Sequence, residues 1–209
     1  MGGGSNSAAK EANRQEAERQ AAIRRTQSSV NAVFDSPQRQ ADIADFVNAT
    51  RQFYQQDLNR QKADADRNLT FALAKSGLIG GSTQVDQQRV LGDDYSRGLL
   101  ASEQKAQGAG ASLEAADQDA RARLISLATS GLDATTAASQ AAASMRSNLQ
   151  AGRSAAELGS LGDSFGTIND FVTRSRDAQK YRQGYLDSAP GGKRAALYGG
   201  ANSNYGGYP

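Results

Sequence analysis

Acidic residues are the first side chains whose type and spacing could do chemistry. Asp93 and Asp94 are adjacent in "LGDDYS", and Glu103 and Glu114 follow downstream. Two facing carboxylates could serve as the acid and the base of a glycoside hydrolase. Neighbouring residues on a helix point about 100° apart, however, so Asp93 and Asp94 do not converge. We therefore interpret these acids as solvated surface groups.

The composition removes most other catalytic chemistry. The chain has 209 residues and contains neither cysteine nor histidine. Thiol nucleophiles, disulfides, Cys/His zinc sites and Ser-His-Asp relays are thereby excluded. We expect no catalytic residue, no cofactor and no metal site, and hence no enzyme. The net charge of +2 is too small for a dedicated nucleic-acid binder, although it does not repel a phosphate backbone.

A glycine-rich stretch, "LAKSGLIGGSTQVD" at 73–86, loosely resembles a phosphate-binding loop. It lacks the lysine of that motif, and no strand precedes it. Helix-prone runs flank it, so we predict a corner between two antiparallel helices. Gly77 would take the left-handed position that ends a helix, and Ser82 or Thr83 would cap the next one. The predicted corner comprises Gly77, Leu78, Gly80, Gly81 and Ser82.

A second stretch, "LATSGLDATTAAS" at 127–139, repeats part of this pattern. Gly131 and Leu132 stand where Gly77 and Leu78 stand in the first stretch, which predicts a second corner. The similarity has two explanations, an internal duplication or the shared chemistry of helix endings. We favour shared chemistry, because a glycine followed by an apolar residue is a common helix ending.

Capping signals and breakers predict the helices between these corners. Ser36 followed by Pro37 indicates an N-cap and a first helical residue, because proline lacks the N–H group that would be unpaired there. We expect a kink or interruption near Gly108 to Gly110, because glycine disfavours helix interiors. The predicted helices span 7–34, 37–76, 83–130, 134–158 and 164–183.

Apolar residues in the second predicted helix recur every eleven positions. Val47, Leu58 and Leu69 form one such series, and Ile43 and Tyr54 belong to another. An eleven-residue repeat corresponds to 3.67 residues per turn, which keeps a stripe on one side of a nearly straight helix. The predicted packing stripe comprises Ile43, Val47, Tyr54, Leu58, Leu69, Leu113, Leu124 and Leu127.

The apolar content predicts thin layers that need partners. Only 38% of the residues are hydrophobic, and many of these are alanine, which buries little area. We predict an all-α fold of long amphipathic helices joined by helical hairpin corners, forming an oligomeric helical ring or tube of coiled-coil type. The predicted domains are a flexible Gly-rich start over 1–6, an elongated assembly domain over 7–183, and a flexible basic Gly/Tyr-rich tail over 184–209.

Basic and aromatic residues mix near the end of the chain. Tyr181 and Tyr185 are interleaved with cations, a combination that suits non-specific contact with DNA or a membrane surface. The alternative is a solvated helix end beside an unstructured tail. The candidate contact residues are Arg174, Arg176, Lys180, Arg182, Lys193 and Arg194.

The layout as a whole resembles the small internal virion (DNA-ejection) proteins of short-tailed bacteriophages. In that family a small-residue turn of the form Gly-x-x-Gly-x-Ser joins two helices and is followed by an acid. The matching positions here are Gly77, Gly80, Ser82 and Asp86. The general layout matches over roughly 7–185, whereas the motif covers about fifteen residues. The resemblance carries over no catalytic residue.

The resemblance implies a homo-oligomer packed inside the capsid near the portal or tail. The protein would contact other internal virion proteins and portal or tail proteins, with DNA as a further candidate partner. After ejection it would help form a channel for phage DNA across the host cell envelope. Family members often start with an apolar segment, whereas this chain starts "MGGGSNSAAKEANRQ", so we expect envelope contact from amphipathic hairpins instead. The alternative is a structural virion protein that is not ejected, such as a scaffold, head-completion or tail-adaptor protein.

Overall fold

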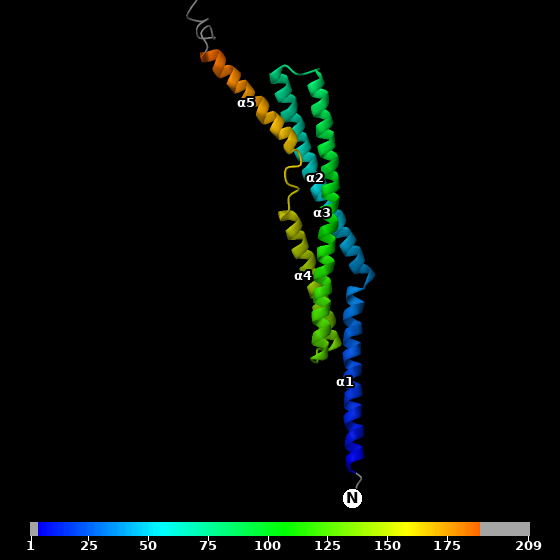
Figure 1. The fold of residues 1–209 in the computed structure, drawn as a ribbon. Helices are drawn as coiled ribbons and strands as arrows, with labels where there is room; N and C mark the ends of the chain where they lie inside the picture. Colours follow the sequence, from blue (N-terminus) through cyan, green and yellow to red (C-terminus); the bar gives the residue numbers. More distant parts are fainter. Residues whose placement is uncertain (1–3, 189–209) are drawn as a thin grey trace, which may run out of the picture. The chain divides into compact units, whose positions relative to one another are not determined.

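The computed structural model describes the backbone of residues 4–188 and the side chains of residues 8–181, and this part of the chain is helical without strands (Figure 1). The all-α prediction is therefore confirmed. Both outer helices extend past their predicted limits at 7 and 183, while Lys193 and Arg194 lie outside the described residues. The helices are α1 (Gly4–Phe34), α2 (Pro37–Ser76), α3 (Ser82–Thr129), α4 (Ala134–Leu158) and α5 (Gly166–Ser188).

The helices divide between two compact units. Unit 1 combines Met1–Gln56 with Leu100–Leu161, and therefore holds α1, α4 and parts of α2 and α3. Unit 2 combines Asp57–Leu99 with Gly162–Pro209, and holds α5 and the remaining parts of α2 and α3. The assembly domain predicted over 7–183 spans both units.

The junction between α1 and α2 follows the capping rule. The Ser36 hydroxyl oxygen accepts a hydrogen bond from the backbone N–H of Arg39 at 3.3 Å. Ser36 thus satisfies one of the N–H groups left unpaired at the start of α2, and Pro37 occupies the first helical position. The sequence prediction for this boundary is confirmed.

Both glycine corners end their helix in the same way. Gly77 and Gly131 have φ values of +70° and +101°, in the region that glycine enters without steric cost. The N–H of Leu78 donates to the Leu73 carbonyl at 3.0 Å, and the glycine N–H donates three residues back. Leu132 repeats this six-residue hydrogen bond at the second corner. Both helices therefore end in a Schellman motif.

The two corners differ in how the next helix begins. Ser82 already lies in the first turn of α3, and the Gln84 side-chain oxygen accepts from the Gly80 N–H at 2.7 Å. The predicted cap by Ser82 or Thr83 is therefore wrong. At the second corner the Asp133 carboxylate caps α4 by accepting from two backbone N–H groups at 3.0 Å. Because only the helix endings agree, shared capping chemistry explains the resemblance better than duplication.

Small residues fill much of the interior of unit 1. The buried residues of α4 are all alanines, and α1 packs Val30 and Phe34 against them. Short side chains on α4 let the two helices approach closely, while the larger side chains on α1 supply the apolar area. The main buried cluster comprises Val30, Phe34, Leu124, Ala137 and Ala141.

Glycines on α3 face large side chains on α2. A Cβ atom added to Gly110 would lie 2.5 Å from Val47 Cγ2, which is closer than atoms can pack. Within unit 2, Gly98 faces Leu58 in the same way. The interruption predicted near Gly108 to Gly110 is therefore wrong, since α3 is continuous and Gly110 permits close packing instead.

The eleven-residue stripe is largely buried. Tyr54, Leu58 and Leu69 on α2 are buried, as are Leu113 and Leu124 on α3, whereas Ile43 and Val47 are half-buried. Leu127 does not belong to the stripe within this chain, because 47% of it is exposed and the neighbouring Ala128 is buried in its place.

Unit 2 packs α5 alongside α2. Phe165, Ile168 and Val172 are buried, together with the leucines that α2 and α3 contribute to this unit. The Gln61 side-chain oxygen accepts from the Ser164 N–H at 3.3 Å. Gln179 on α5 donates to the Ser76 hydroxyl at 3.0 Å, so the two helices run parallel. Gln179, within α5, thus lies beside the first glycine corner.

The close approach at Gly110 gives a test with a control on the same helix. Gly110→Ala should lower the free energy of unfolding by about 1–3 kcal/mol, because the new methyl group overpacks against Val47. Gly108→Ala adds the same group in open space and should raise stability by up to about 1 kcal/mol through helix propensity. Urea unfolding measures both. Equal effects of the two substitutions would contradict the packing described here.

Candidate functional site

The acids considered for catalysis have different surroundings and different partners. Asp93 is exposed and pairs with Arg89 one turn away. Asp94 is buried, so its interpretation as a solvated acid is wrong; one oxygen contacts Arg97, and the other has no partner among the described residues. Glu103 belongs to an ion pair between helices. The acids therefore form no acid–base pair.

Arg39, Asp117 and Asn148 form a polar cluster inside unit 1. Arg39 on α2 donates two hydrogen bonds to the Asp117 carboxylate on α3, at 2.6 and 2.9 Å. The Asn148 amide on α4 donates a third, at 2.9 Å. Only 2% of the Arg39 side chain and 9% of the Asp117 side chain are exposed. This cluster therefore joins three helices through one buried, fully engaged carboxylate.

Two further arginine–carboxylate pairs connect α3 to α2 and to the junction between α1 and α2. Arg51 on α2 donates to both oxygens of Glu103 on α3. Arg121 on α3 donates to both oxygens of Asp35, at 2.8 and 3.0 Å, and also to the side-chain oxygen of Asn31. In both pairs the planar guanidinium makes two parallel hydrogen bonds, the geometry that arginine forms best with a carboxylate.

Together the three pairs define the register of unit 1. Asp35, Arg39 and Arg51 follow one another along the chain, and their partners Arg121, Asp117 and Glu103 follow in the reverse order. That order is the order of antiparallel helices. A shift by one turn would separate all three pairs and leave the Arg39 and Asp117 charges buried without partners. We call this set the register ladder.

Electrostatics favour the ionised form of several carboxylates. Arg51 and then Gln107 hold the pKa of Glu103 below its usual value, because both hydrogen-bond the carboxylate. Glu103 in turn raises the pKa of Arg51. Hydrogen bonds from Thr136 and Thr135 lower the pKa of Asp133 at the start of α4. These shifts support helix pairing and capping rather than proton transfer.

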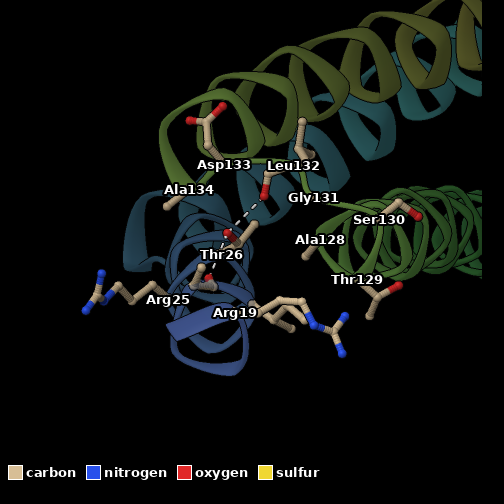
Figure 2. A pocket seen from close by; sticks show the side chains of 12 residues that line it. Arg19, Arg25, Thr26, Ala128, Thr129, Ser130, Gly131, Leu132, Asp133 and Ala134 are labelled. Atoms are coloured by element: carbon tan, nitrogen blue, oxygen red, sulfur yellow. Dashed lines mark hydrogen bonds between the residues drawn. The ribbon is translucent and has the colours of Figure 1, made fainter. Parts of the chain in front are cut away.

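The cavity in Figure 2 lies between α1 and the corner that joins α3 to α4. Its volume is about 510 Å³. The buried Thr26 points toward Leu132, and its hydroxyl lies 3.1 Å from the carbonyl oxygens of both Leu132 and Ala22. Arg25 points away from the corner. The contact between Thr26 and the Leu132 carbonyl joins the corner to α1, so the Thr26 hydroxyl already has a partner within the chain.

The predicted site residues gather at three places. The first corner, with Gly77, Leu78, Gly80, Gly81 and Ser82, belongs to unit 2, and the second corner, with Gly131 and Leu132, belongs to unit 1. Arg174, Arg176 and Lys180 are exposed on α5, and Lys180 pairs loosely with Asp177 at 3.6 Å. Arg182 lies on α5, but its side chain is outside the described residues.

Comparison with protein-family models, curated proteins and solved structures finds no match to this chain. Within residues 8–181, no group of three or more acidic side chains could hold a metal ion. None of the helices, as far as the structure describes them, is long and apolar enough to cross a membrane. The candidate functional features of the described residues are the register ladder and the exposed surfaces.

Removing one partner of the buried pair tests the register ladder. Arg39→Ala should lower the free energy of unfolding by about 3–5 kcal/mol, because Asp117 would remain buried without its cation. The double variant Arg39→Met/Asp117→Leu should recover most of this loss. Arg14→Ala, which removes an exposed pair on α1, should change stability by less than about 1 kcal/mol. If the single and double variants were equally unstable, lost packing would explain the loss and the ladder would not.

The lowered pKa of Glu103 predicts an acid-sensitive contribution to stability. A depressed pKa means that the ionised group stabilises the fold above its ordinary pKa of about 4.3, and that this stabilisation is lost as the pH falls through the folded-state value. Glu103→Gln should therefore be less stable than the natural chain at pH 7 and should approach it near pH 3. Thermal unfolding at both pH values measures this. Glu114→Gln, on the exposed face of α3, serves as the control. If Glu103→Gln lost as much stability between pH 7 and pH 3 as the natural chain does, the proposed contribution of ionised Glu103 to stability would be contradicted.

Proposed function

We propose that the protein is an internal virion (DNA-ejection) protein. It oligomerises near the portal and, after release, helps form a conduit for phage DNA across the host envelope. The observation that carries the proposal is the contrast between interior and surface. The interior of unit 1 relies in part on alanine and glycine, while large apolar side chains remain exposed in both units. Among the described residues the exposed ones are Phe71, Leu78, Ile79, Val85, Leu100, Leu127, Leu158 and Tyr181.

These exposed side chains support self-association. In unit 1, Leu100, Leu127 and Leu158 expose large apolar side chains that a second copy of the chain would cover. Residues 8–20 of α1 are exposed on every side and are held by local pairs such as Arg14 with Glu18. A polar helix without neighbours is suited to lie between copies of the chain. A ring or tube of copies would give both features a partner.

The register ladder suits a chain that unfolds and refolds. Passage through a narrow portal channel requires the helices to separate, which a disulfide would prevent. This chain has no cysteine, and unit 1 is aligned instead by ion pairs that break and re-form in water. The same pairs specify the register again when the helices reassemble. Reversible alignment therefore favours ejection over permanent residence, although the helices alone would also serve a scaffold or tail adaptor.

The composition of full and emptied particles tests the proposal. Virions that carry the protein should lose it when the genome is released, because an ejected protein leaves with or before the DNA. Quantitative mass spectrometry of particles before and after triggered release measures its copy number, with the major capsid protein as the internal control. An unchanged copy number would favour the structural alternative and contradict ejection.

A further inference from the structure

The first glycine corner exposes apolar side chains at the end of unit 2. Leu78 is 38% exposed and Ile79 is 58% exposed, and both lie in the turn itself. Gly77 and Gly80 hold this turn with positive φ values. Two helical residues beside it are also exposed. The apolar residues of this corner surface are Phe71, Leu78, Ile79 and Val85.

The corner carries no negative charge. No acidic residue occurs from Arg67 to Val85, so the chain that makes the turn is acid-free between Asp66 and Asp86. Lys75 is exposed in the last turn of α2, directly before the glycine. This surface combines exposed apolar groups with a lysine that has no acidic neighbour in the turn. It therefore differs from an ordinary solvated turn, in which polar residues such as Asn, Asp and Ser are usual.

The fold brings cations of α5 near the same place. The hydrogen bond from Gln179 to Ser76 fixes α5 beside the end of α2, one residue before Gly77. Arg176 and Lys180 lie within one turn of Gln179 and are exposed. Lys180 also pairs loosely with the exposed Asp177, and Tyr181 is 81% exposed. Two features that are separated by about one hundred residues in sequence therefore meet at one end of unit 2.

The chemistry of this corner surface fits a bilayer better than a protein or a nucleic acid. A stable protein interface buries about 800 Å² on each partner, whereas the apolar part of this surface is a turn and its flanking residues. Nucleic acid would engage the cations but would leave Leu78 and Ile79 in water. An anionic bilayer accepts apolar side chains at its headgroup boundary, attracts cations to its surface and favours tyrosine at the interface.

We propose that the corner surface binds the surface of an anionic lipid bilayer, with Leu78 and Ile79 entering the headgroup boundary. Lys75, Arg176 and Lys180 would face the anionic headgroups. The contact is peripheral, in keeping with the lack of a spanning helix in the described part of the chain. The inference rests on the proposed function for its setting, the host envelope, and it names lipid as the partner of one defined surface.

The absence of tryptophan in the chain allows a direct test. Ile79→Trp places a single fluorophore in the corner surface, and Leu158→Trp places one at an exposed position in unit 1. With the full-length chain and vesicles of phosphatidylcholine and phosphatidylglycerol, the emission of Ile79→Trp should shift to shorter wavelength. Leu158→Trp should not shift, and pure phosphatidylcholine vesicles should give a much smaller shift for Ile79→Trp.

Vesicle flotation measures separately how much the apolar side chains and the positive charge contribute to vesicle binding. Leu78→Ser/Ile79→Ser should weaken binding to the anionic vesicles about tenfold or more, because it removes the inserted apolar area. Lys75→Glu should weaken binding to anionic vesicles and leave binding to neutral ones unchanged. These residues are exposed, so circular dichroism and the thermal midpoint should match those of the natural chain.

Three results would overturn the inference. They are no shift of Ile79→Trp with anionic vesicles, equal shifts of both tryptophans, or DNA retardation that depends on Lys75 and Arg176 without any vesicle binding. The last result would assign the surface to nucleic acid. Loss of the protein from emptied virions without vesicle binding would overturn only the lipid inference. Vesicle binding by a protein that stays in the particle would overturn only the proposed function.

Discussion

The buried ion pair between Arg39 and Asp117 is the constraint on which the arrangement of unit 1 depends. Two charges that are nearly removed from water are tolerable only when they are paired and hydrogen-bonded, and Asn148 completes the set. The interior of unit 1 combines alanines such as Ala137 and Ala141 with larger side chains such as Phe46 and Leu113. Apolar packing holds the helices together, and the charged pairs align them together with close contacts such as that of Gly110 with Val47.

The pairing of large side chains with small ones explains why the helices pack closely around a small interior. Glycines on α3 accept Val47 and Leu58 from α2, and alanines on α4 accept Val30 and Phe34 from α1. Large side chains therefore face small ones, so the helices lie close together and the interior has little volume. Apolar side chains such as Leu100, Leu127 and Leu158 then remain at the surface. A chain built in this way gains further apolar burial only by meeting something outside itself.

Local chemistry could be predicted from the sequence, whereas long-range partners could not. The cap at Ser36 and Pro37 and the glycine helix endings depend on neighbouring residues, and the structure has them as predicted. The predicted break near Gly110 failed because the reason for that glycine is Val47, sixty-three positions away in the sequence. The sequence predicts a solvated Asp94, because no local pattern indicates its burial. The ladder partners were also missed, since Arg39 and Asp117 are seventy-eight positions apart and neither belongs to a motif.

Self-association is the central claim that follows from this architecture, and sedimentation velocity tests it most directly. Over a range of protein concentrations, the account predicts that the weight-average mass rises well above that of one chain. Replacing Leu100 and Leu127 with serine should lower the mass reached at the highest concentration, because fewer exposed apolar side chains would be covered. A well-folded species with the mass of one chain at every concentration would contradict the account.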